Sequence, residues 1–438
     1  MNGTLSFDVS WLPEAYGPPP VSGTAANLTI RVGGQIATRN DDEWSKSIEN
    51  SARLALYPLA LWLADCWWRL RWESEPSHHS PGSDWRMAHE LGAAGHGFLW
   101  PNLTFASDSQ SIQVIGHPTN PLSEEPVRFL ADFVEAVPAN AFERAIDDFL
   151  ALVLARLRAL GLENSDLERL WNDVCKERRD PEIAILRRFE AVLGFDPTEA
   201  PQGLLNRMVS LLGRAGEQAA EEIAPACAGP DPAGALTAIE EIASLPGIKG
   251  SEGAADVLRA KVLSIAVPPT WRPWEQGRSL ARAVRQIQGW NGQPLSDDSV
   301  ASLLGIRAAD LQPSWSGRSA PVLGLAVRES SSGVRLHFRK RNRAGLRFEA
   351  TRLLCDELIA PQNDRWLPTT DSGTSRQKIQ RAFAAEFLCP IQSLDDFLSG
   401  DYSQERIEDA AEHFVISPLA VSSHLANNNR ISAWAGTL

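Results

Sequence analysis

Residues 347–356, RFEATRLLCD, decide how the C-terminal part of this chain is interpreted. Their apolar side chains recur at three- and four-residue spacing, which predicts a helix. A strand-like segment and a basic loop precede this helix. The rhythm is that of a helix that holds a metal on one face, yet no residue in the stretch is a good metal ligand. The question is therefore whether this helix belongs to a working hydrolase.

Two later segments accompany this helix. RQKIQRAFAAEFLCP (376–390) predicts a helix that ends or kinks before Pro390, and IEDAAEHFVISPLAVSSHL (407–425) predicts two helices joined by a turn at Val415–Ser417. With these three blocks, residues 335–430 resemble the ImmA/IrrE family of zinc metallopeptidases. The second block is the most specific, because it closely matches the family helix E-x-x-A-N-x-F-A-A-E-L-L-M-P. The resemblance covers the C-terminal third alone and implies a zincin-like fold there.

The resemblance also shows which chemical groups have been replaced. In that family two His four residues apart bind zinc, a Glu after the first His is the general base, and a Glu on the next helix is the third ligand. The resemblance places Arg352 and Asp356 at the two His positions, Leu353 at the base and Gln377 at the third ligand. Arg has no lone pair for a metal, Leu cannot accept a proton, and one carboxylate does not hold zinc. We therefore expect a pseudo-metallopeptidase, with no catalytic residue, bound metal or cofactor.

A polar cluster is the expected replacement for the metal. Arg352 and Asp356 are four residues apart, so their side chains can meet on one helical face. We expect a partly buried Arg352–Asp356 pair that is hydrogen-bonded to Gln377. The alternative is that Arg352 points into solvent.

A basic segment precedes the same helix, in a chain whose net charge is -13. It is either a solvated loop or a binding site for an anionic partner, nucleotide or nucleic acid. The candidate anion-binding residues are Arg339, Lys340, Arg341, Arg343 and Arg347.

One other stretch, HELGAAGHG (89–97), begins with the His-Glu pair of a zinc-binding helix. Its two His are seven residues apart, which separates the rings by roughly 10 Å on a helix. A metal site at His89, Glu90 and His96 therefore needs the helix to break at its glycines. His78 and His79 lie in a polar loop, for which adventitious metal binding is the most that is expected.

The rest of the chain predicts a mainly α fold with small α+β parts. Residues 1–120 are expected to form a small α+β domain, 127–265 a helical domain and 266–438 the degenerate ImmA/IrrE-like domain. Strands are expected at LSFDVSWL (5–12), at ANLTIRVGG (26–34) and, as a pair, in 103–116. A helix is expected from about 43 to 73, with Trp62, Trp67, Trp68 and Trp72 forming either core or a docking stripe.

Composition narrows the class of protein. The negative net charge disfavours nucleic acid and anionic membranes as general partners. The five cysteines form no CxxC pair, which argues against a disulfide framework. The N-terminus lacks a signal-peptide pattern, and no apolar run reaches the length of a membrane span, so a cytoplasmic protein without a membrane partner is expected.

These observations favour a non-catalytic regulatory or protein-binding component. The resemblance implies settings such as mobile-element control, toxin–antitoxin pairs, stress response or phage defence, with a protein partner. Two alternatives stay open: a metal-dependent peptidase with a non-standard site, and a nucleic-acid or nucleotide sensor that uses the 339–347 loop. The predicted helix 418–425 carries no Lys or Arg, which disfavours DNA reading by the C-terminal helix pair.

Overall fold

The computed structural model has a mainly α fold with α+β parts. The chain divides into two compact units, Met1–Leu205 and Asn206–Leu438. The structure describes residues 3–13, 17–76, 80–251, 254–263, 272–314, 322–329 and 333–431.

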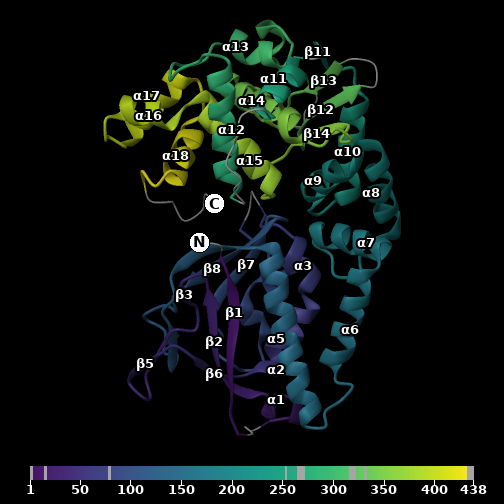
Figure 1. Ribbon diagram of the computed structural model, residues 1–438, viewed down its shortest axis with the longest axis vertical. Coiled ribbons are helices and arrows are strands. Elements are labelled where there is room, and N and C mark those ends of the chain that lie inside the picture. Colours follow the sequence, from purple (N-terminus) through teal and green to yellow (C-terminus); the bar gives the residue numbers. More distant parts are fainter. Residues whose placement is uncertain are drawn as a thin grey trace. The chain divides into compact units, whose positions relative to one another are not determined.

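The described residues of the first unit form three antiparallel sheets. Figure 1 shows β1, β2 and β6 of the first sheet side by side. In the first sheet, the central strand β2 pairs with β1, β3 and β6; the other two have the orders β10-β8-β7 and β5-β4-β9. The strands are β1 (Leu5–Trp11), β2 (Ala25–Val32), β3 (Gln35–Ile36), β4 (Asn40–Asp42), β5 (Ser47–Glu49), β6 (Ala52–Ala55), β7 (Asn102–Ser107), β8 (Ser111–His117), β9 (Val127–Phe129) and β10 (Phe133–Pro138). The expected strands at 5–12 and 26–34 and the pair in 103–116 are thereby confirmed.

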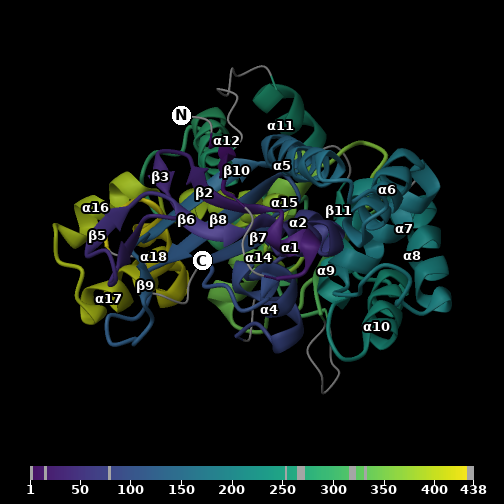
Figure 2. The ribbon, with the colours of Figure 1, turned by 90° about the horizontal axis from the view of Figure 1, so that it is seen from below.

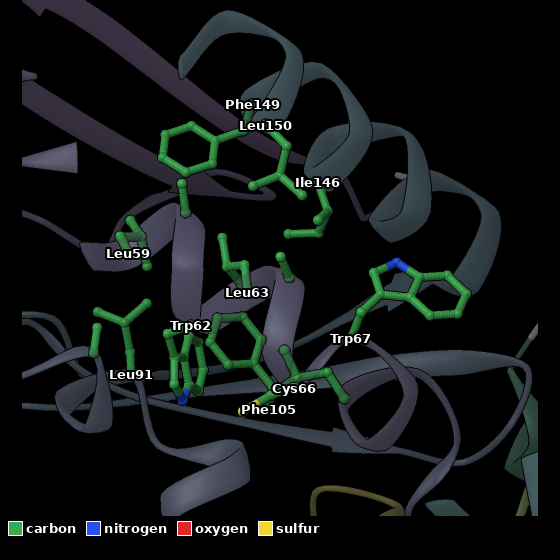
Figure 3. Close-up of a cluster of buried hydrophobic side chains, with 14 of the residues drawn as sticks. Leu59, Trp62, Leu63, Cys66, Trp67, Leu91, Phe105, Ile146, Phe149 and Leu150 are labelled. Carbon is green, nitrogen blue, oxygen red and sulfur yellow. The ribbon is translucent and has the colours of Figure 1, made fainter. Parts of the chain in front are cut away.

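The helices of this unit pack on one another and on the sheets. They are α1 (Pro19–Ser22), α2 (Leu56–Asp65), α3 (Trp67–Trp72), α4 (Ser83–His89), the short 3-10 helix η1 (Leu91–Ala94), α5 (Ala139–Ala159), α6 (Asp166–Arg179) and α7 (Pro181–Val192). Figure 3 shows Ile146 and Leu150 of α5 directed toward Leu63 of α2. Trp62, Trp67 and Trp68 are buried, so three of the four expected tryptophans form core rather than a docking stripe.

Two expectations for the first unit are wrong. The helix expected from about 43 begins only at Leu56, because the preceding residues form β4, β5 and β6. The carboxylate of Asp42 accepts hydrogen bonds from the backbone N–H of Trp44 (2.9 Å) and Ser45 (3.4 Å), which closes a hairpin turn instead of capping a helix.

The second correction concerns residues 127–138, which were expected to begin a helical domain. They form β9 and β10, and β10 pairs with β8 through Phe133↔Gly116 and Val137↔Ile112. A Cβ at Gly116 would lie 2.6 Å from the ring of Phe133, so glycine leaves the space that this ring fills.

The second unit is built around one antiparallel sheet, ordered β11-β13-β12-β14. Its strands are β11 (Ile248–Ser251), β12 (Gly324–Glu329), β13 (Gly333–His337) and β14 (Trp366–Thr369). The helices are α8 (Gln202–Ala215), which begins before the boundary, α9 (Glu217–Cys227), α10 (Pro232–Ser244), α11 (Ala254–Leu263), α12 (Pro273–Ile287), α13 (Asp297–Leu303), the 3-10 helix η2 (Ala308–Asp310), α14 (Arg343–Ile359), α15 (Ser375–Leu388), α16 (Ile391–Leu398), α17 (Gln404–Phe414) and α18 (Pro418–Asn427).

The C-terminal helices α16, α17 and α18 lie together (Figure 2). The expected turn between α17 and α18 is present: Val415 has a left-handed backbone (φ 54°), and the Ser417 hydroxyl accepts the N–H of Ala420 to start α18. The expected helix pair is therefore confirmed.

The segment 127–265, treated above as one helical domain, contributes to both units. Helices α5, α6 and α7 belong to the first unit, whereas α9, α10 and α11 belong to the second. No helix in the described parts of the chain combines the length and the apolar character needed to cross a bilayer.

Candidate functional site: a buried network of arginines and carboxylates

Helices α14 and α15 carry the positions that the sequence singled out. The side chain of Asn342 caps α14 by accepting the N–H of Gly345, and the hydroxyl of Thr374 caps α15 by accepting the N–H of Gln377. Both helices bury polar as well as apolar residues around their circumference, so neither has a simple solvent-facing side. Buried charges of this kind require partners.

Arg352 and Gln377 meet directly. One guanidinium nitrogen of Arg352, Nη2, donates to Oε1 of Gln377 over 2.6 Å and to the backbone oxygen of Thr370 over 2.5 Å. The same nitrogen lies 3.3 Å from Oε1 of Gln380. Arg352 is 4% exposed, which excludes the alternative that it points into solvent.

Asp356 has a different partner from the one expected. Arg376, in the first turn of α15, donates from Nε to Oδ1 of Asp356 (2.7 Å) and from Nη2 to Oδ2 (2.9 Å). Its third nitrogen donates to Asp364 over 2.8 Å. The expected Arg352–Asp356 pair is therefore wrong, because Arg376 offers the carboxylate a planar, two-pronged donor.

Glu222 of α9 completes this end of the network, and the sequence analysis missed it. Its Oε2 accepts hydrogen bonds from the hydroxyl of Thr374 (2.6 Å) and from Nε2 of Gln377 (3.0 Å). Burial raises the pKa of Glu222, and the positive charge of Arg376 opposes that rise. A sequence signal existed: Glu222 follows Ala219 by three residues and so falls on the apolar face of α9.

Gly216 brings the start of α9 against Asp364. Its φ of +106° is a conformation that favours glycine, and a Cβ there would lie 2.4 Å from Oδ1 of Asp364. The backbone N–H of Arg365 donates to the oxygen of Ala215 over 2.7 Å. The N-terminus of α9 thus lies beside a buried carboxylate, where the helix dipole favours negative charge.

The candidate anion-binding residues do not form one exposed surface. Arg339 is engaged by Glu349 (3.1 Å) and by Asp371 (2.5 Å). Arg347 is buried, donates to the backbone oxygen of Leu295 over 2.7 Å and pairs with Asp297. The exposed Arg343 also pairs with Asp297, over 2.9 Å. Lys340 is half-buried and Arg341 exposed.

Leu353, at the expected position of the catalytic base, packs into the hydrophobic core of the second unit and is 1% exposed. The core around it includes Ala350 and Leu354. A side chain in this position supplies packing and takes no part in proton transfer.

The alternative metal site at His89, Glu90 and His96 is not assembled. His89 is buried, with Nδ1 2.8 Å from the backbone oxygen of Phe105 and Nε2 3.0 Å from a carboxylate oxygen of Glu73. Glu90 pairs with Arg86, and His96 is exposed. Both ring nitrogens of His89 therefore face protein acceptors. His78 and His79 lie outside the described residues.

Among the residues that the structure describes, no group of three or more His, Cys, Asp or Glu side chains is arranged to hold a metal ion. No family model, curated protein or solved structure matches the chain. The site is a buried set of donors and acceptors that bond to one another. Arg376 in it is paired with the carboxylates of Asp356 and Asp364, whereas Arg352 donates to neutral oxygens.

Proposed function

We propose that residues 335–430 are a degenerate ImmA/IrrE-like peptidase scaffold that acts as a non-catalytic, protein-binding regulatory component. The carrying observation is the direct hydrogen bond between Arg352 and Gln377. Ligands of one metal must converge on a point. Side chains at two of the former ligand positions do converge here, and they bind each other.

The order of elements is consistent with this proposal. A strand, a basic loop and a long helix are followed by a second helix with the AAEFLCP sequence and by the C-terminal helix pair. Leu353 packs in the core at the position of the general base, so the scaffold lacks the group that would activate water. A scaffold that cannot activate water can still bind other molecules through its surface. We therefore favour recognition of a protein partner as its function.

A restoration experiment tests the scaffold. The variant Arg352→His/Asp356→His/Gln377→Glu reinstates the family's ligand set, and we expect the purified full-length variant to bind about one zinc. A matched control, Glu405→His/Asp409→His on the exposed face of α17, has the same two-His spacing without a third ligand and is expected to bind zinc weakly. A folded triple variant that binds no more zinc than this control contradicts the resemblance.

The absence of catalysis is tested on the wild-type protein. We expect no cleavage of an unstructured polypeptide such as casein, with or without added zinc. Cleavage that a chelator abolishes contradicts the proposal. Affinity purification of the tagged chain from its native host, followed by mass spectrometry, is expected to recover a stoichiometric protein partner.

A further inference from the structure

The charges in the buried network are unevenly distributed. At one end, Arg376 is surrounded by three carboxylates: Asp356, Asp364 and Glu222. At the other end, Arg352 has no carboxylate within hydrogen-bond distance in the described structure; its guanidinium donates to neutral oxygens. The two ends therefore differ in electrostatic character, although both are buried.

Arg352 is an incompletely satisfied cation. Its Nε is buried and has no hydrogen-bond partner among the described residues. Burial, together with the positive charges of Arg381 and Arg339, lowers the pKa of Arg352 to about 9. A buried guanidinium is normally compensated by a carboxylate or another anion, so this one is a strong point of attraction for an incoming negative charge.

Three more cations act on this end of the network: the charges of Arg381 and Arg339 act on Arg352, and the charge of Lys340 acts on Asp371. Arg381 follows Gln377 by one helical turn on α15 and donates to the backbone oxygen of Ser372 over 3.0 Å. Arg339 and Lys340 come from the loop after β13. Burial lowers the pKa of Arg381, as expected for a cation that is poorly neutralised.

Asp371 is one of two carboxylates near these cations; the other, Glu349, is buried and pairs with Arg339 over 3.1 Å. Arg339 donates a hydrogen bond to each carboxylate oxygen of Asp371, from Nη1 to Oδ2 over 2.8 Å and from Nη2 to Oδ1 over 2.5 Å. Burial acts to raise the pKa of Asp371, but the hydrogen bonds and charge of Arg339, with the charges of Lys340 and Arg352, bring it below its ordinary value. The Asp371 side chain is 30% exposed, so solvent reaches this end of the network.

We propose that Asp371 occupies the place of an external oxyanion, and that a phosphate group displaces it to bind Arg339, Lys340, Arg352 and Arg381. A phosphate group presents several oxygens to forked guanidinium donors and carries more charge than one carboxylate. This site goes beyond the proposed scaffold function and does not depend on it. It also differs from the 339–347 loop considered earlier, because two of its four cations lie on α14 and α15.

Titration of the full-length protein with inorganic phosphate, followed by calorimetry at low and high salt, tests the site. We expect saturable binding that Arg381→Gln weakens by about tenfold or more. Asp371→Asn removes the resident carboxylate and is expected to strengthen binding several-fold. Titration with AMP and ATP separates the two sources of the ligand: tighter binding of a nucleotide than of free phosphate identifies a nucleotide site, and equal binding identifies a site for phosphate alone.

Matched controls make the outcome decisive. Arg307→Gln removes the same charge from an exposed position in the same unit and is expected to leave phosphate affinity unchanged. If Arg381→Gln does not fold, as judged by circular dichroism, Lys340→Gln takes its place. The proposal is overturned if neither wild type nor Asp371→Asn binds phosphate, or if Arg307→Gln weakens binding as much as the site variants.

Discussion

Nε2 of Gln377 donates to Glu222 over 3.0 Å, which ties the first turn of α15 to helix α9. The same amide accepts hydrogen bonds on its other side from Arg352 and from the backbone N–H of Thr370. A neutral amide thereby joins a buried cation to a buried acid. The family resemblance implies glutamate at position 377. A glutamate here would bring a second carboxylate against Glu222, and the two would repel each other unless one were protonated.

Loss of this amide should be costly. Gln377→Ala removes one hydrogen bond from each of Arg352, Glu222 and the backbone N–H of Thr370, and we expect the free energy of unfolding to fall by about 2–4 kcal/mol. Gln404→Ala is the control, because Gln404 is exposed and bonds only to the exposed Glu408 in the described contacts. Urea unfolding measures both, and equal effects of the two changes would contradict the network.

We expect the burial of an Arg–carboxylate pair, rather than its hydrogen-bond geometry, to decide how much its loss lowers the free energy of unfolding. Arg376 and Arg430 each hold an aspartate, Asp356 and Asp395, through two hydrogen bonds or more. Arg376→Met leaves buried carboxylates uncompensated and is expected to destabilise by about 3–5 kcal/mol. Arg430→Met breaks a more exposed pair and should cost at most about 1 kcal/mol. Thermal unfolding of both variants tests this ordering.

Two glycines near the network should respond to alanine with opposite signs. Gly216 has φ +106° and no room for a Cβ beside Asp364, so Gly216→Ala is expected to destabilise by more than about 1 kcal/mol. Gly213, inside α8, has nothing within 4 Å of such a Cβ. Gly213→Ala should therefore stabilise by about 0.5–1 kcal/mol. The two melting temperatures should move in opposite directions, and a stabilising Gly216→Ala would refute the close approach of α9 to Asp364.

Local sequence signals predicted four helices of the second unit, α14, α15, α17 and α18. The expected end before Pro390 and the expected turn at Val415–Ser417 match the observed end of α15 at Leu388 and the break between α17 and α18. The short strands β11 and β14 were not predicted, because four residues carry too little periodicity to separate a strand from a loop.

The site was predicted only as far as spacing along one helix allows. The four-residue interval suggested an Arg352–Asp356 pair, but α15 supplies a better donor in Arg376 once the two helices pack. Glu222 lies 155 residues before Gln377, and no local pattern reveals such a contact. The position of Glu222 on the apolar face of α9 indicated only that this acid would be buried and would need hydrogen-bond partners.

The buried imidazole of His337 should make the second unit sensitive to acid. His337 ends β13, and its Nε2 has no hydrogen-bond partner among the described residues. Burial, with a smaller contribution from the charge of Arg335, lowers the pKa of His337 to about 4. Between the ordinary value of about 6.5 and that value, the unfolded chain binds a proton that the folded chain does not. Stability from this group is therefore complete above about pH 6.5 and is lost as the pH falls, by at most about 1.4 kcal/mol per pH unit.

Replacement of the ring isolates this effect. We expect His337→Gln to remove the corresponding part of the pH dependence, so that wild type loses stability relative to the variant as the pH falls from about 6.5 to about 4.5. His117, the exposed last residue of β8, provides the control variant His117→Gln. Urea unfolding across this pH range, with hydrogen exchange to follow each unit separately, supplies the measurement. Parallel pH curves for wild type and His337→Gln would show that His337 binds its proton equally well in the folded and unfolded chain.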